Sequence, residues 1–293
     1  MVCDRGVKPL HKNAAEIANG HCVMTSAKSF PVLPWLLRAG VAMCFLGHGA
    51  FGLITKAAWV PYFGVAGIPE AWAWKLMPWV GAMDVAIAGL VFLWPCRALF
   101  GWAACWAVWT ALLRPLSGQG WPEFFERAGN YGVPIAVLAV IGLRGPWFAR
   151  LTETWPAMSG PVRGRAIVVL RLALATLLAG HAGCALILQK PDLAQHYEVF
   201  NAANPADVML VVGWFEVALA AAVLGFRTPA LIVFACLWKL ATESLFLASG
   251  TPAPLFEVIE RGGSYVVPLA LAYLLARPAE PAPLPQPQLS GSI

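Results

Sequence analysis

The chain has 293 residues, of which 59% are hydrophobic and only 12% are charged, and its formal net charge at pH 7 is +5. A soluble domain of this length carries about twice that share of charged residues, so the composition argues against a water-soluble globular protein. The positive charge is modest and forms no basic cluster with interleaved aromatic residues, which argues against nucleic acid as a partner.

The apolar residues lie in continuous runs of about 17 to 23 residues, the length that crosses the hydrocarbon core of a lipid bilayer. Only helices and closed barrels span lipid, and continuous apolar runs favour helices over the alternating pattern of a barrel. The sequence therefore predicts an all-α integral membrane protein in contact with the lipid bilayer. Its eight transmembrane helices are expected at 34–55, 77–94, 98–116, 129–146, 166–188, 207–225, 229–248 and 263–277.

Composition divides the chain into five parts. Residues 1–33 are polar and lack the apolar core of a signal peptide, and residues 278–293 are rich in proline, so both are expected to be disordered tails. The hydrophilic stretch 148–165 is expected to link two groups of four helices. These groups occupy residues 34–147 and 166–277.

The two groups of four helices repeat each other. LLRAGVAMCFLGHG corresponds to VLRLALATLLAGHA, WVGAMDVAIAGL to VVGWFEVALAAA, and FFERAGNYGVP to EVIERGGSYVVP. Because each group holds four helices, both groups enter the membrane from the same side, which makes them parallel repeats. The aligned polar residues are His48 and His181, Asp84 and Glu216, Glu126 and Glu260, Arg127 and Arg261, and Tyr131 and Tyr265.

Lysine and arginine are more frequent on the side of the chain termini. By the positive-inside rule both termini then face the cytoplasm of a bacterial-type inner membrane or a plasma membrane. Arg38 and Arg171 fall near the cytoplasmic ends of their helices, where they are expected to anchor the helix at the interface. His48 follows Arg38 by ten residues, or about 15 Å along a helix. The repeated polar groups other than the arginine anchors therefore form one layer in the outer half of the bundle.

Asp84 and Glu216 are the most informative members of this layer. A carboxylate inside a membrane helix is costly, and it usually pairs or faces a polar cavity. The expected partners are either the arginines that open the fourth helix of each half or the two histidines. A histidine with a carboxylate, repeated at one depth, suggests a ligand-binding or proton-handling pocket, although each histidine could instead be a hydrogen-bonded packing residue.

The other repeated residues also have structural interpretations. Glu126 and Arg127, and their counterparts Glu260 and Arg261, could be surface charges at a helix start, where a carboxylate suits the helix dipole. Both tyrosines could be interfacial aromatics. The glycines that flank His48 could permit close packing of helices.

Metal and haem sites have little support in the sequence. The seven cysteines include no CxxC pair, so neither a disulfide framework nor a cysteine metal cluster is expected. Cys44 lies one turn before His48, whereas Cys184 lies one turn after His181, so this pairing is not repeated. No CxxCH signature for haem attachment is present, and the residues alone leave the cofactor open.

Two motifs resemble the DoxX family of four-span membrane proteins. The first helix has leucine–arginine followed ten residues later by glycine–histidine–glycine, and the second has a glycine, a carboxylate and small residues. The matching positions are Leu37, Arg38, Gly47, His48, Gly49, Gly81, Asp84 and Gly89. Each half covers one such unit, so the chain resembles a fused tandem of two DoxX-like units.

The resemblance implies a function, because some members of that family are subunits of thiosulfate:quinone oxidoreductase. It implies a quinone-interacting subunit in which histidine and carboxylate bind quinone carbonyls and relay protons. The chain has no flavin fingerprint or iron–sulfur cysteine set, so a redox partner protein would carry the electrons. The alternatives are a non-enzymatic carrier of a small molecule or lipid or a cargo receptor, for which no span shows a break, and a structural assembly subunit.

Overall fold

The computed structural model describes residues 32–151, 155, 158–201 and 203–277. The expected tails at 1–33 and 278–293 lie outside the described residues, except that Val32 and Leu33 open the first helix. Every regular element in the described ranges is helical, which confirms the predicted all-α class.

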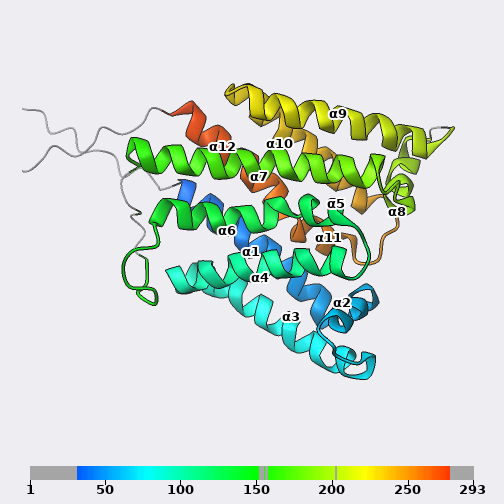
Figure 1. The fold of residues 1–293 in the computed structure, drawn as a ribbon, viewed down its shortest axis with the longest axis horizontal. Helices are drawn as coiled ribbons and strands as arrows, with labels where there is room; N and C mark the ends of the chain where they lie inside the picture. The colour runs from blue at the N-terminus through cyan, green and yellow to red at the C-terminus, as the bar shows by residue number, and fades with distance from the viewer. Residues whose placement is uncertain (1–31, 152–154, 156–157, 202, 278–293) are drawn as a thin grey trace, which may run out of the picture.

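In the described part of the chain eight long helices run side by side, and the short helices gather toward one end of the bundle (Figure 1). The long helices are α1 (Val32–Leu53), α3 (Glu70–Leu93), α4 (Arg97–Leu116), α6 (Ala128–Ile141), α7 (Gly160–Leu186), α9 (Pro205–Gly225), α10 (Pro229–Ser244) and α12 (Gly262–Ala276). The short ones are α2 (Val60–Val65), α5 (Trp121–Glu126), α8 (Pro191–Gln195) and α11 (Pro254–Glu260), with 3-10 turns η1 (Ala57–Trp59), η2 (His196–Phe200) and η3 (Leu245–Leu247).

Seven helical stretches of the described residues are long and apolar enough to cross a membrane. They are α1, α3, α4, α7, α9, α10 with η3, and α11 with α12. The remaining expected span, α6, has 14 residues and covers about 21 Å, less than the ~30 Å of a hydrocarbon core. It ends early because Gly142 adopts a φ of 71°, so an eighth crossing stays a prediction.

The expected linker at 148–165 is shorter than its composition predicts. Helix α7 begins at Gly160, six residues before the predicted start at 166. Pro161 lies in its first turn, where the fixed φ of proline suits a helix and its missing N–H would be unpaired in any case. The polar arginines after Pro161 therefore extend the helix instead of preceding it.

A backbone break lies just before the fourth long helix of each half, and the expected span at 263–277 is itself the unbroken α12. Arg261, with a φ of −84° and a ψ of 20°, separates α11 from α12. Arg127 has nearly the same conformation between α5 and α6. Glycines follow each break and weaken helix continuation there. Broken backbone is tolerated at membrane depth where protein surrounds it, and both breaks lie inside the bundle.

The centre of the molecule is formed by α1, α6, α7 and α12, which contact one another. Helix α12 packs against α1 as well as α10, and α6 packs against α7 as well as α4. The glycines before the two histidines also let the short helices approach, because a Cβ at Gly47 would collide with the backbone of Glu260 at the end of α11, and one at Gly180 with that of Glu126 at the end of α5. The fourth helix of each half thus lies against the first helix of the other.

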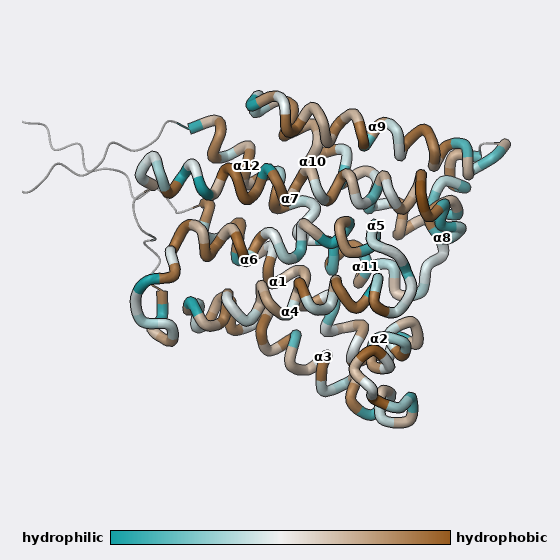
Figure 2. Tube along the Cα trace, in the orientation of Figure 1, coloured by the Kyte–Doolittle hydropathy of each residue, from teal (hydrophilic) through white to brown (hydrophobic). Residues whose placement is uncertain are grey.

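The outer surfaces of the bundle are apolar. Large side chains such as Trp79, Leu93, Val211 and Trp214 are mostly exposed although they lie on long helices. Hydrophilic positions gather instead at helix ends and, within the bundle, around α5 and α11 (Figure 2). Such a distribution suits a multi-pass protein whose helices contact lipid and whose polar groups face inward.

Candidate functional site

Each half of the chain holds a histidine–carboxylate pair, which is buried in the second half and partly exposed at His48 in the first. In the first half, His48 Nδ1 on α1 lies 2.7 Å from Asp84 Oδ2 on α3. In the second half, His181 Nδ1 on α7 lies 2.5 Å from Glu216 Oε2 on α9. Both carboxylate residues have no exposed surface. Either the arginines before the fourth helices or the two histidines were expected to pair with these carboxylates, and the structure shows the pairs with the histidines.

The second pair belongs to a larger network of charges. Trp238 Nε1 on α10 donates to Glu216 Oε1 at 3.0 Å, and Lys239 Nζ lies 3.5 Å from the same oxygen. Lys239 also lies 3.0 Å from Glu243, which in turn lies 2.9 Å from Arg261. Sequence reasoning missed Lys239 and Glu243. Their signal was a lysine and a glutamate four residues apart within an apolar span, where such residues need partners.

The first half has no such network at the aligned positions. The segment of α4 aligned with Trp238, Lys239 and Glu243 carries Trp106, Ala107 and Ala111 instead. There the structure has a cavity of about 420 Å³ between α1, α3 and α4, partly covered by η1 and α2. Its lining is largely apolar and includes the aromatic rings of His48, Trp59, Tyr62, Trp79, Trp106 and Trp109, so it is called the aromatic cavity below.

The residues at the two helix breaks meet in the middle of the molecule. Arg127 lies 3.0 Å from Glu126 and 3.8 Å from Glu260, while Arg261 lies 3.8 Å from Glu126. Glu260 and Arg261 are both buried. The interpretation of these residues as surface charges at a helix start is therefore wrong. They are interior charges that are paired across the two halves.

A second pair of contacts also links the halves. Lys56 Nζ, in the loop after α1, lies 2.5 Å from Glu257 on α11. At the aligned position after α7, Lys190 pairs with Glu123 on α5. Burial lowers the pKa of Lys190, but the Glu123 carboxylate outweighs burial and raises that pKa above its usual value. All four residues line a polar cavity of about 690 Å³.

Each of the two repeated tyrosines contacts the short helix that lies on the other side of the backbone break. Tyr265 is buried, and its hydroxyl donates to the carbonyl of Val258 on α11 at 3.2 Å. Tyr131 stacks on Phe124 of α5 with ring centroids 5.4 Å apart. Each tyrosine therefore packs its long helix against the short helix before it. The interpretation of Tyr265 as an interfacial aromatic is wrong, because its side chain is buried. The same interpretation of Tyr131 stays a prediction.

The two aligned arginines of the first helices have different surroundings. Arg171 donates to the carbonyls that end α9, at 2.6 to 2.7 Å, as an anchor near a helix C-terminus would. Arg38 is only 3% exposed and lies over the rings of Trp35 and Trp155, 5.5 and 6.0 Å from their centroids. The prediction of an interfacial anchor is therefore wrong for Arg38, which packs inside the protein.

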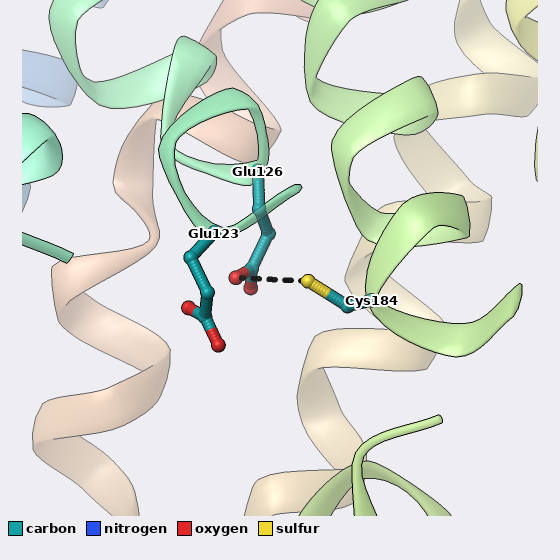
Figure 3. A group of neighbouring side chains, drawn as sticks. All are labelled: Glu123, Glu126 and Cys184. Carbon is teal, nitrogen blue, oxygen red and sulfur yellow. Dashed lines mark hydrogen bonds between the residues drawn. The ribbon is translucent and has the colours of Figure 1, made fainter. Parts of the chain in front are cut away.

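Glu123, Glu126 and Cys184 form a cluster of potential metal ligands (Figure 3). Their ligand atoms lie within 4.8 Å of one another, and Cys184 Sγ lies 4.0 Å from Glu126 Oε2. Lys190 and Arg127 already pair with the two carboxylates. A metal ion would have to displace these cations, so we assign no metal site here.

Comparison with protein-family models, with curated proteins and with solved structures gives no match for the chain. The functional assignment therefore rests on the geometry of the site and on the resemblance carried by its sequence motifs.

Proposed function

We propose that the chain is a fused tandem of two DoxX-like units, with α5 and α6 together completing an eighth crossing. The matched histidine–carboxylate pairs and the matched breaks at Arg127 and Arg261 support two parallel repeats. Both termini then face the cytoplasm, and the polar layer lies in the outer half of a bacterial-type inner membrane or plasma membrane.

We propose further that the protein is a quinone-binding subunit of a membrane oxidoreductase system. The observation that carries this proposal is the aromatic cavity of the first half with His48 in its wall. Its volume lies in the range of small-molecule sites, and an apolar lining with few polar groups is typical of such sites. Arg127 and Asn130 also line the cavity and can donate hydrogen bonds to a carbonyl oxygen.

His48 is the residue that exchanges protons with the ligand in this proposal. Asp84 engages Nδ1, which orients the ring, so exchange takes place at Nε2. Reduction of a quinone to its quinol takes up two electrons and two protons. With a quinone bound, a redox partner protein would supply the electrons, and His48 would donate one proton at Nε2 and be reprotonated from solvent, to which its side chain is 17% exposed, before it donates the second.

Quinone binding by the purified full chain tests this function. Titration of a short-chain quinone in detergent is expected to quench the fluorescence of the cavity tryptophans. His48→Gln, which removes a hydrogen bond from a group able to carry charge, should weaken binding by about tenfold or more. Leu46→Ala, at an exposed position on the same helix, is the matched control and should leave binding unchanged.

A carrier of a small polar molecule is the second candidate function. Two helix breaks at aligned positions beside a polar cavity of about 690 Å³ are a feature of membrane carriers. Failure of quinone to bind, together with solute uptake into vesicles that is lost in Arg127→Gln, would favour the carrier over the quinone-binding subunit.

A further inference from the structure

The polar cavity of about 690 Å³ is bordered by two groups of ion-paired residues, and neither group is neutral. The first group is centred on Glu123, whose carboxylate contacts both Arg114 and Lys190. All three residues line the cavity. One carboxylate against two cations gives this group a net charge of +1.

The second group is larger and has the opposite net charge. Its cations are Lys56, Arg127, Lys239 and Arg261, and its carboxylates are those of Glu126, Glu216, Glu243, Glu257 and Glu260. Four cations against five carboxylates give a net charge of −1 when His181 is neutral. Asp192, the remaining charged residue of the lining, is exposed to solvent and makes no ion pair with the described residues.

The two groups meet inside the cavity. A carboxylate oxygen of Glu123 and one of Glu126 lie within 4.8 Å of each other, and both side chains extend into the same space near Cys184 (Figure 3). One small molecule can therefore contact both groups. A molecule with a negative and a positive end compensates both, whereas an ion of either sign compensates one group and adds to the charge of the other.

Arg114 has unused hydrogen-bonding capacity for the negative end of such a molecule. Its Nη1 donates to Glu123 at 3.4 Å, but Nε and Nη2 make no hydrogen bond with the described residues and keep accessible surface. A guanidinium group binds a carboxylate through two parallel hydrogen bonds. The free edge of Arg114 is therefore suited to a ligand carboxylate.

Glu126 and His181 have the corresponding capacity for the positive end. Arg127 contacts Oε2 of Glu126, whereas the contact of Arg261 with Oε1 is as long as 3.8 Å. His181 engages Glu216 through Nδ1, so Nε2 of the neutral ring is an acceptor without a partner among the described residues. An ammonium group has three N–H donors and can use both acceptors without displacing Arg127.

We propose that the polar cavity binds one small zwitterion per chain, of the free amino acid class, with its carboxylate on Arg114 and its ammonium group on Glu126 and His181. His196, which is 9% exposed, lines the same cavity and makes no hydrogen bond with the described residues, so it offers the ligand a further polar contact. This inference goes beyond the quinone-binding function, which concerns the adjoining aromatic cavity, and does not depend on it.

The test measures the binding of three probes to the purified full chain in detergent by isothermal titration calorimetry. L-alanine carries both charges, propionate lacks the ammonium group, and ethylamine lacks the carboxylate. L-alanine is expected to bind with one molecule per chain, and the other two probes about tenfold or more weakly. Arg114→Gln should lower the affinity for L-alanine to that of ethylamine, while Lys190 still pairs with Glu123.

Arg144→Gln is the matched control, because Arg144 is exposed after α6 and lines neither cavity. It should leave the binding of L-alanine unchanged. No binding of L-alanine, or equally tight binding of propionate or ethylamine, would overturn the inference. A folded Arg114→Gln variant that binds L-alanine as wild type does would overturn it as well. Quinone binding is measured separately through the tryptophans of the aromatic cavity, so each of these outcomes leaves the quinone-binding function in place.

Discussion

His48 and His181 show how one residue type, bonded to the same partner type, acquires two roles. The His48 ring lies 4.2 Å from that of Trp59 and borders the aromatic cavity, so it can contact a ligand. His181 is bonded to a glutamate that also holds Trp238 and Lys239. In the proposed function, ligand chemistry therefore belongs to His48, whereas His181 lines the polar cavity of about 690 Å³ and not the aromatic one.

His196 is, with His181, one of two buried histidines among the described residues, and sequence reasoning did not include it among the site residues. It lies in η2, packs edge-on against Phe246 with ring centroids 4.2 Å apart, and lines the polar cavity. Burial and the nearby Arg261 guanidinium lower the pKa of His196, and the carboxylates of Glu243 and Glu257 offset this shift only in part. The folded protein therefore favours the neutral ring.

This shift predicts a sensitivity to acid. The pKa of His196 is lower in the folded state than its unfolded value of about 6.5. Above about pH 6.5 the ring is neutral in both states, so it has no effect on stability. As the pH falls below about 6.5, the unfolded state binds a proton more readily than the folded state, and the fold loses stability. In detergent, thermal unfolding at pH 7.5 and 5.5 should show a smaller acid-induced loss for His196→Gln than for wild type. The difference is at most about 1.4 kcal/mol per pH unit. Identical pH dependence in both proteins would contradict the prediction.

Helices α4 and α10 show how aligned elements can differ in function. Both carry a tryptophan at the same position, but α10 adds the buried pair of Lys239 and Glu243, whereas α4 has alanines there. The buried charges keep α10 close to α9 and α12 through Glu216 and Arg261. Helix α4 has alanines in place of these charges, so it makes no such contacts and leaves space beside it. For this reason α4, and not α10, borders the aromatic cavity.

The ion pair on α10 predicts an unequal effect of single and double substitutions. Lys239→Met removes the buried cation between Glu216 and Glu243, and removal of one partner of a buried pair costs about 3–5 kcal/mol. Lys239→Met with Glu243→Gln removes both charges and should be less destabilising, because Glu216 keeps His181 and Trp238 and Arg261 keeps Glu257. Chemical unfolding in detergent measures both variants, and an equal loss in the two would exclude this interpretation of the pair.

At the scale of the whole molecule, the two halves share one interior. A single cluster of buried apolar residues includes Leu37 of α1, Val137 of α6, Leu174 of α7 and Leu271 of α12. The ion pairs at the breaks and the loop lysines cross between the halves as well. We therefore expect the halves to fold together and not as separate four-helix domains.

The contact between α6 and α12 gives a direct test of this shared interior. A Cβ at Gly129 would lie 2.7 Å from the carbonyl carbon of Gly263, so Gly129→Ala forces the two helices apart and should cost about 1–3 kcal/mol. Gly89→Ala is the matched control, because nothing lies within 4 Å of its Cβ and alanine favours a helix by roughly 1 kcal/mol. The temperature of thermal unfolding should therefore fall for Gly129→Ala and stay level or rise for Gly89→Ala. A tolerated Gly129→Ala would argue against close packing of the halves.

Much of the fold was predictable because it depends on local properties of the chain. Continuous apolar runs determine where helices form in a membrane protein, and seven helical stretches of the described residues are long and apolar enough to cross, the last of them only when α11 is joined to α12. The repeated motifs identified His48, Asp84 and their counterparts as buried polar positions, since a charge within an apolar run needs a partner wherever the helix packs.

Only the tertiary structure decided which partners meet. Helix packing brings histidines rather than arginines to Asp84 and Glu216, and the breaks at Arg127 and Arg261 turn four apparent surface charges inward. It also determines that Ala107 borders a cavity while Lys239 fills the matching space. The physical reason is that hydropathy and helix length act along the chain, whereas pairing and cavity shape depend on side chains from helices far apart in sequence.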